Sequence, residues 1–216
     1  IRFCDWSSDV CSSDLQGALL GNPARIYRVS FSGELTYEIN VPARLGPDLW
    51  HELMKAGAPH GLQPFGLDAL LLMRLEKGFL HIGTDTDGTT VPDDVGWGRA
   101  AAGKKADFIG KRSLTLPENV RSDRLQLIGL RSVDGADIPI GSHLRLTGSM
   151  QSTDGWVTSV GRAVLTGEPI ALAMLRAGRQ QVGAEVSVHD AGAVTRACVV
   201  TPPFFDPSGE IGRAHV

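Results

Sequence analysis

Residues 28–39 carry the sequence RVSFSGELTYEI, in which two alternating runs meet at the turn-forming residues 32–34. Apolar and polar side chains alternate over residues 25–31, and the same alternation returns over residues 35–41. Alternation with a period of two is typical of strands that bury one face. Two such runs on either side of a glycine-containing turn predict a β-hairpin.

Two amphipathic helices are predicted after this hairpin. The first is expected from about Leu45 to Ala56, because its apolar residues lie on one stripe and Gly57 follows. The second is expected over 64–77, where leucines recur at helical spacing. Pro64 suits the first turn of that helix and Gly78 the position after its last turn.

The second half of the chain predicts short strands. Residues 81–98 are rich in Gly, Asp and Thr, which predicts a long ordered loop, and a domain boundary is expected near 119–123. Turn residues separate nearly all of the β-type runs that follow, which predicts a small antiparallel barrel or sandwich. The fold class is therefore α+β. The expected strands are 125–132, 143–147, 156–164, 170–175, 185–189 and 194–201.

Both ends of the chain have the character of added sequence. Residues 10–14 and 211–215 can be encoded by complementary DNA, as in adapter-derived tails. We therefore expect adapter-derived tails at 1–15 and 211–216 and treat the chain as an internal piece of a longer protein. The expected domains are 16–120, which contains the hairpin and helices, and a C-terminal β-barrel at 121–210.

Composition limits the classes of function. The formal net charge is -3, which provides no broad basic field for nucleic acid, and no apolar run is long enough for a membrane span. We expect neither nucleic acid nor membrane as a partner. Outside the expected tails only Cys198 remains, which fits a cytoplasmic location and excludes an intrachain disulfide framework there.

Most standard catalytic signatures are absent from the sequence. It contains no Walker loop, no G-x-G-x-x-G and no G-x-S-x-G motif, and its histidines do not form a metal-ligand set. We therefore expect no metal site, and no flavin- or nicotinamide-binding role can be placed on these residues.

Three motifs in order resemble the glycine-cleavage T-protein family. The run 28–39 is similar to the family's hairpin motif, approximately R-x-G-Y-T-G-E-x-G-[FY]-E-[IV], and residues 64–78 resemble its next helix. Residues 155–159, 170–173 and 203–207 are similar to its C-terminal barrel. The resemblance covers about Asn22 to Glu210. It implies a fragment of the T-protein-like folate-binding fold, in which a hairpin plus helices at 16–120 form a partial folate-binding aminomethyltransferase-like domain. A small antiparallel β-barrel domain follows at 121–210.

Further motifs resemble one branch of that family, the alpha subunit of heterotetrameric sarcosine oxidases. They lie at 76–79, 83–90 and 104–114. Where aminomethyltransferases carry a folate-associated arginine in the helix, this chain has Leu70, which also favours the oxidase branch.

The resemblance implies a cofactor site on the hairpin. A pterin ring presents a ring N–H beside an exocyclic amine, and one carboxylate accepts both hydrogen bonds. Glu38 is expected to make this contact, with Tyr37 and Arg28 supporting the folate pocket. Composition alone favours an ordinary solvated carboxylate on a polar strand face for Glu38. The family's catalytic aspartate lies outside the chain, so catalytic residues stay unknown.

The implied function is that of a tetrahydrofolate-binding module in an oxidoreductase acting on CH–NH groups. It would accept the one-carbon unit released from sarcosine as 5,10-methylenetetrahydrofolate, and the piece alone is expected to be inactive. FAD, FMN and NAD are expected only on missing regions or partner subunits, and the other sarcosine oxidase subunits are the expected protein partners. The alternatives are an aminomethyltransferase, a dimethylglycine dehydrogenase-like enzyme, and a non-catalytic folate-dependent scaffold for iron–sulfur assembly.

Three groups of charged residues have ordinary explanations. Arg74 and Glu76 near a helix end predict ion pairing in a structural role. The aspartates between residues 85 and 94 predict turn chemistry and not a metal site. The basic residues between 104 and 112 predict a solvated face, with a folate polyglutamate tail as the alternative ligand.

Overall fold

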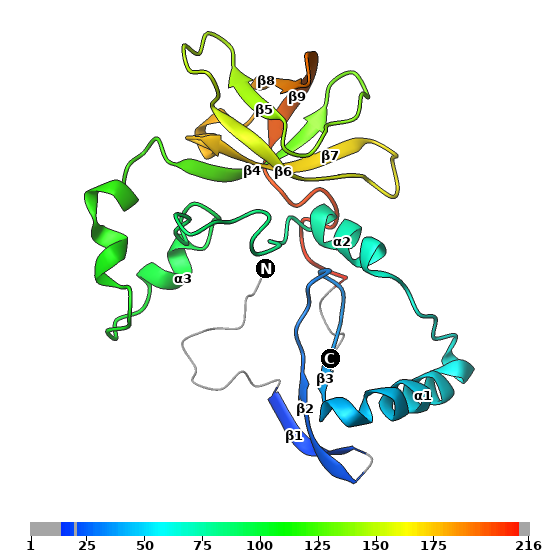
Figure 1. Ribbon diagram of the computed structural model, residues 1–216. Coiled ribbons are helices and arrows are strands. Elements are labelled where there is room, and N and C mark those ends of the chain that lie inside the picture. Colours follow the sequence, from blue (N-terminus) through cyan, green and yellow to red (C-terminus); the bar gives the residue numbers. More distant parts are fainter. Residues whose placement is uncertain (1–13, 20, 212–216) are drawn as a thin grey trace. The chain divides into compact units, whose positions relative to one another are not determined.

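The computed structural model of the chain describes residues 14–19 and 21–211 (Figure 1). They divide into two compact units, one formed by the chain up to Leu71 with the residues from Ser208 onward, and the other by Leu72–Pro207.

A three-stranded antiparallel sheet forms the first part of the first unit. Its strands are β1 (Asp14–Leu19), β2 (Asn22–Tyr27) and β3 (Glu38–Asn40), in the order β1-β2-β3. The expected hairpin is confirmed by the antiparallel pairing of β2 with β3. Both strands are shorter than their alternating runs, because the chain leaves the ladder after Tyr27 and rejoins it at Glu38.

The first predicted helix is confirmed as α1 (Gly46–Gly57), which follows the short 3₁₀ turn η1 (Ala43–Leu45). Pro47 lies in its first turn, where a missing N–H costs no helical hydrogen bond. Within the described chain, no residue of α1 is buried, and its apolar side chains Trp50 and Leu53 are largely exposed. A further 3₁₀ turn, η2 (Ala58–His60), follows directly.

The second predicted helix is confirmed as α2 (Leu67–Glu76). Its end has the hydrogen bonds of a Schellman motif, in which the Gly78 N–H donates to the Leu75 carbonyl and the Phe79 N–H to the Arg74 carbonyl. Gly78 adopts a φ of 65°, and a Cβ there would meet Pro202. Glycine therefore suits this position for both conformation and space.

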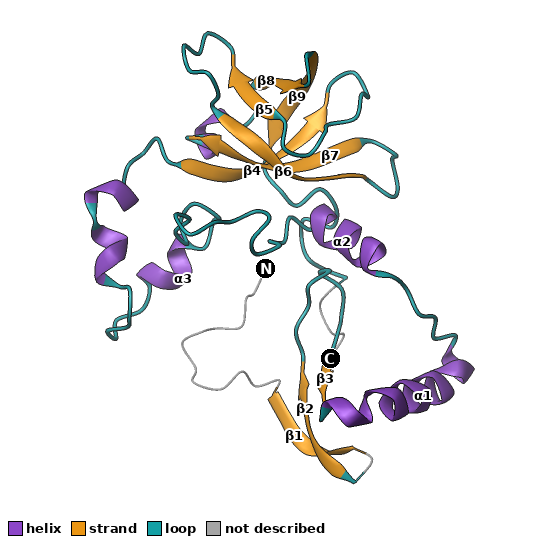
Figure 2. Cartoon of the chain, viewed as in Figure 1, coloured by secondary structure: helices purple, strands orange, loops and turns teal. Residues whose placement is uncertain are grey.

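Loops and short helices follow α2, as the composition of residues 81–98 predicts (Figure 2). The helical pieces are α3 (Gly98–Ala102), η3 (Arg112–Thr115) and η4 (Pro117–Asn119). Hydrogen bonds to the side chains of Asp87, Thr90 and Asp94 order the loop between α2 and α3.

The second unit is built around a closed six-stranded antiparallel barrel, seen as the orange strands at the top of Figure 2. All six expected strands are present, and the order around the barrel is β4-β7-β6-β5-β8-β9. The small-barrel prediction and the α+β class are therefore confirmed. The strands are β4 (Leu125–Ser132), β5 (His143–Leu146), β6 (Gly155–Arg162), β7 (Pro169–Arg176), β8 (Glu185–Asp190) and β9 (Ala193–Val200), with η5 (Gly178–Gln181) after β7.

Strand β7 is buried on both faces. Ala171, Ala173 and Leu175 belong to the core inside the barrel, whereas Ile170 and Leu172 pack with Leu75 at the end of α2. Burial of apolar area on this scale is the main favourable term in folding. Strand β7 thus joins the core inside the barrel to a second apolar cluster, around Leu75, on the outside of the barrel.

The compact units divide at residues 71 and 72, whereas the sequence places a domain boundary near 119–123. The division differs because the loops after α2 pack with the barrel strands. The domain limits 16–120 and 121–210 stay a proposal. Of the expected tails, Asp14 and Leu15 lie in β1 and Ile211 lies in a turn, while 1–13 and 212–216 fall outside the described residues.

Candidate functional site

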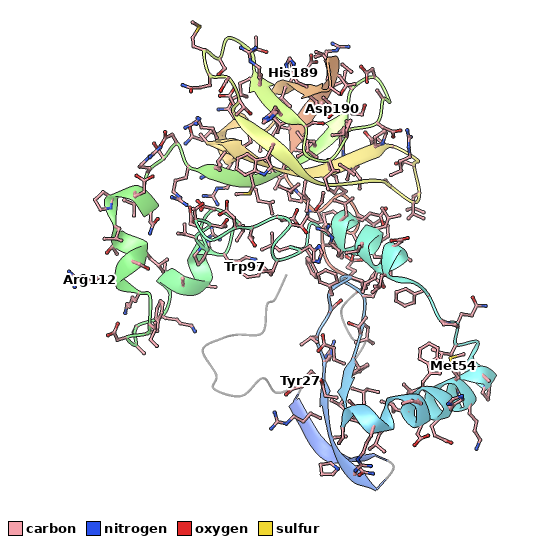
Figure 3. The ribbon with its side chains drawn as sticks, viewed as in Figure 1. Tyr27, Met54, Trp97, Arg112, His189 and Asp190 are labelled. Carbon is pink, nitrogen blue, oxygen red and sulfur yellow. The ribbon has the colours of Figure 1, made fainter. Side chains whose placement is uncertain are left out.

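The expected cofactor residue Glu38 lies at the first position of β3. It is exposed, and no hydrogen bond or ion pair is formed by its side chain within the part of the chain that the structure describes. The pairing of β2 with β3 sets Glu38 directly opposite Tyr27, and Asn40 opposite Arg25. Directly opposite residues share a face of the sheet. Glu38 therefore shares a polar face with Tyr27 (labelled in Figure 3), Arg25 and Asn40.

The two other expected residues lie where this ladder ends. Arg28 follows the last residue of β2, and Tyr37, which is 57% exposed, precedes the first residue of β3. Continuing the register of Tyr27 with Glu38 by one step would match Arg28 with Tyr37. The structure thus brings all three expected residues to the same end of one strand pair.

The loop between Arg28 and Tyr37 has its own hydrogen bonds. The Gly33 N–H donates to the Ser30 Oγ at 2.8 Å, and the Thr36 hydroxyl donates to the Val29 carbonyl. Gly33 has a φ of 83°, a conformation that glycine adopts without strain. These bonds fix the loop that carries two of the expected residues.

A second polar cluster lies buried in the other unit. The Arg74 Nη1 donates to the Asp85 Oδ2 at 2.7 Å, and the two side chains are only 6% and 0% exposed. The Arg74 Nη2 donates to the Ser159 Oγ at 2.8 Å, and the His81 N–H donates to the Asp85 Oδ2 at 2.8 Å. The pair connects the end of α2 to the following loop and to strand β6.

Strand β6 supplies two neighbouring hydroxyls to the same carboxylate oxygen. Thr158 donates to the Asp85 Oδ1 at 2.5 Å and Ser159 at 2.6 Å. Consecutive strand residues normally point to opposite faces, but the register between β6 and β7 shifts between Val157 and Ser159. This bulge explains how both hydroxyls reach Asp85.

The structural role predicted for Arg74 fits these contacts, but the sequence did not indicate its partners. Asp87 matches the predicted turn chemistry, because its Oδ1 accepts hydrogen bonds from the Thr89 and Thr90 hydroxyls. Asp85 and Asp94 do more than form turns. Asp94 accepts two hydrogen bonds from the Arg124 guanidinium, at 2.8 and 2.6 Å.

Hydrogen bonds also shift the acidity of these groups. Donation from Thr89 lowers the pKa of Asp87 below its usual range, against a smaller opposing effect of burial. The bidentate contact with Asp94 raises the pKa of Arg124 above its usual value, against a smaller opposing effect of burial.

A cleft of about 930 Å³ opens beside these groups, entirely within the second unit. The loop 83–94 and the segment 113–125 form its sides, and strands β6 and β7 contribute Trp156, Thr158, Met174 and Arg176. Its lining combines carboxylates, hydroxyls and arginines with apolar side chains.

The basic residues between 104 and 112 lie outside this cleft. Lys111 donates to the carbonyls of Lys105 and Ala106, and its ammonium group lies 5.9 Å from the centre of the Phe108 ring. Among the residues with described positions, no three His, Cys, Asp or Glu side chains form a group that could hold a metal ion. No helix in the described ranges has the length and apolar character needed to cross a membrane.

Two sequence profiles match the chain in the order of its two halves. The GCVT N-terminal domain matches residues 13–105, and the glycine cleavage T-protein C-terminal barrel domain matches residues 126–206. The chain belongs to the glycine cleavage T-protein family. The second profile coincides with the barrel strands, and the first covers the hairpin and both helices.

Individual relatives fall into two groups. The chain is 39% identical over 197 residues to a sarcosine oxidase subunit alpha from Rhizobium meliloti, and 36% identical to one from Corynebacterium sp. strain P-1. It is 33% identical over 190 residues to an aminomethyltransferase from Moorella thermoacetica. Each match covers 88% of the chain, but only 20% of the two oxidase subunits and 51% of the aminomethyltransferase. The chain therefore spans about a fifth of the oxidase relatives' length.

A solved structure supports the same fold. The crystal structure of aminomethyltransferase T of the glycine cleavage system from Bartonella henselae superposes with a TM-score of 0.69 at 24% identity. The match covers 84% of this chain and 49% of that one. The predicted T-protein-like fold is thereby confirmed.

Proposed function

We propose that this chain binds tetrahydrofolate and forms the C-terminal part of a sarcosine oxidase alpha subunit. In that role the whole protein demethylates sarcosine oxidatively, and this module captures the released one-carbon unit as 5,10-methylenetetrahydrofolate. The greater similarity to sarcosine oxidase alpha subunits than to aminomethyltransferases supports the oxidase branch. Leu70, in the place of a folate-associated arginine, supports the same choice.

The folate proposal depends on one observation, the exposure of the Glu38 carboxylate and its lack of hydrogen-bond donors within the described residues. A carboxylate held by a strand is a suitable acceptor for the two adjacent N–H donors of a pterin. Tyr37 and Arg28, at the same end of the ladder, would support the hairpin around the folate pocket.

The chemistry required of this module is positioning. A folate nitrogen held next to an iminium or formaldehyde equivalent reacts by proximity, without a nucleophile from the protein. We assign no residue of this chain to the binding of FAD, FMN or NAD. These cofactors are proposed to bind other regions or subunits of the whole protein. The other subunits are its proposed partners.

The test is Glu38→Gln in the complete protein. The substitution preserves shape but replaces one acceptor by a donor that faces a pterin donor. Tetrahydrofolate affinity is expected to fall by at least about 2 kcal/mol, measured by calorimetric titration. Glu52→Gln, an exposed carboxylate on α1, is the matched control and should bind normally. Equal affinity in the two variants would return Glu38 to the class of solvated strand carboxylates.

Product partition tests the oxidase assignment separately. If sarcosine is oxidised at a flavin elsewhere, Glu38→Gln should leave sarcosine turnover intact while the one-carbon unit leaves as free formaldehyde. An aminomethyltransferase would instead show no sarcosine oxidation in either form. The two assignments therefore differ in the unsubstituted protein, before any effect of Glu38 is measured.

A further inference from the structure

The cleft in the second unit has an apolar floor on the outside of the barrel. Pairing of β6 with β7 sets Trp156 directly opposite Met174, and pairing of β4 with β7 sets Leu125 opposite Arg176. Met174 and Arg176 are two residues apart on one strand, so they share a face. Leu175, which lies between them, and Ala173, which precedes Met174, point into the core. The floor is therefore an apolar strip that ends at one arginine.

The acidic side chains of the cleft already have donors. Asp85 pairs with Arg74, Asp94 with Arg124, and Asp87 accepts from two threonines. Glu118 and Asp123 both accept from Arg121, at distances of 2.8 to 2.9 Å. None of these carboxylates needs a further cation.

Arg176 is the arginine of the cleft whose donors are least used. Its Nη1 lies 3.4 Å from the Asp123 Oδ2, and that oxygen already accepts from the Arg121 Nη2 at 2.9 Å. A contact of 3.4 Å is at the weak limit of hydrogen bonding. The Arg176 Nε is buried and has no hydrogen-bond partner within the described residues. The Arg176 side chain as a whole is 39% exposed, so its terminal Nη groups, and not the buried Nε, are open to a ligand acceptor.

The shape of the guanidinium selects the ligand group. Its two Nη groups each direct one N–H outward in the guanidinium plane, and a carboxylate accepts both in a bidentate contact. The surrounding charge selects against polyanions, because the five carboxylates of the lining outnumber its three arginines. A single carboxylate on an apolar body fits both the arginine and the floor.

We propose that this cleft binds a small monocarboxylate with a flat apolar body, held by Arg176 and resting on Trp156 and Met174. The site uses none of the hairpin residues, so it is independent of the tetrahydrofolate proposal. Its volume of about 930 Å³ leaves ample room for a single aromatic ring with its carboxylate.

Benzoate is the probe, and titration of the 216-residue chain by calorimetry and ligand-observed NMR measures its binding. Benzamide has the same ring without the charge, so it should bind at least about tenfold more weakly than benzoate. Arg176→Gln should weaken benzoate binding by a similar factor of about ten. Arg176→Lys retains the charge but lacks the paired N–H groups, and should also lose most of the affinity.

Arg196→Gln is the matched control. Arg196 is half exposed on β9 and makes one ion pair, at 3.3 Å to Glu185, much as Arg176 does with Asp123. This variant should bind benzoate as the unaltered chain does. The proposal is overturned if benzoate does not bind, if benzamide binds equally well, or if folded Arg176→Gln retains full affinity. The comparison of benzoate with benzamide decides the matter even if both Arg176 variants fail to fold.

Discussion

Arg74 and Glu38 are both charged residues on regular secondary structure, but they have opposite surroundings. The Arg74 guanidinium is 6% exposed and bonds to Asp85 and Ser159. The Glu38 carboxylate is exposed, and its oxygens lack donors in the described part of the chain. A buried charge must have partners because desolvation is unfavourable, whereas an exposed one is stable without any.

This difference separates two uses of charge in one chain. The buried pair joins α2, a loop and the barrel, so its removal should be measured as lost stability. The hairpin carboxylate contributes little to folding and remains open to a ligand, so its removal should be measured as lost binding. Four predictions test this separation.

The largest effect is expected for Asp85→Asn. The substitution leaves the Arg74 charge buried without its counter-ion. It also replaces one carboxylate oxygen by an amide NH2 group, a donor that faces other donors. Breaking a buried ion pair from one side typically costs about 3–5 kcal/mol. The free energy of unfolding from urea titration should fall by that amount.

Asp134→Asn serves as the matched control for Asp85. Asp134 is exposed, with its Oδ1 3.2 Å from the Ala136 N–H, so a change within about 0.5 kcal/mol is expected. A loss for Asp85→Asn no greater than for this control would mean that the buried pair contributes no stability.

A smaller loss is expected for Lys77→Met. The Lys77 Nζ lies 2.6 Å from the Asp206 Oδ2, and both side chains are less than a tenth exposed. The substitution leaves the Asp206 carboxylate buried without this ammonium group, but it removes one donor where Asp85→Asn disturbs four, so a loss of about 3 kcal/mol is expected. Lys55→Met on the exposed side of α1 provides the control in the same urea titration. Equal midpoints for the two lysine variants would contradict the prediction.

The periodicity of apolar residues and the positions of turn residues predicted most of the fold. All six barrel strands begin and end within two residues of their expected limits, because apolar residues such as Val186 and Val188 alternate with exposed ones and turns separate the runs. The contacts of Asp85 could not be predicted in this way. They join residues 73 and 74 positions apart and depend on a bulge in β6 that has no sequence signal.

The candidate site was predictable in part for the same reason. Alternation assigns Glu38 to the polar face of its strand, but its neighbour across the sheet depends on register. A turn centred on Gly33 would pair Tyr27 with Ile39, whereas the observed pairing is Tyr27 with Glu38. A shift of one residue moves every side chain to the other face, so Tyr27 was missed as a neighbour of Glu38.

Almost no effect on stability is expected for Glu38→Gln. The side chain is exposed, so the free energy of unfolding should change by less than about 0.5 kcal/mol, although folate affinity should fall. Urea titration of the same preparation used for binding provides the measurement. A loss of stability comparable to that of Lys77→Met would show that Glu38 belongs with the structural charges.

The smallest effect concerns the loop carboxylate Asp87, which lies between the two classes because it is exposed but has donors. Its pKa in the folded chain is lowered from 3.8, first of all by hydrogen bonds from Thr89. A lowered folded pKa contributes stability above the unfolded pKa, and this contribution is lost as the pH falls through the folded value. Thr89→Val removes the hydroxyl donor but preserves the backbone N–H donor, so the pKa of Asp87 should rise toward 3.8. Solvent screening limits the stability difference near neutral pH to a few tenths, at most about 0.5 kcal/mol. Carboxyl-carbon NMR titration of Asp87 in both forms is the direct measurement, and identical titration midpoints would show that the turn does not hold this charge.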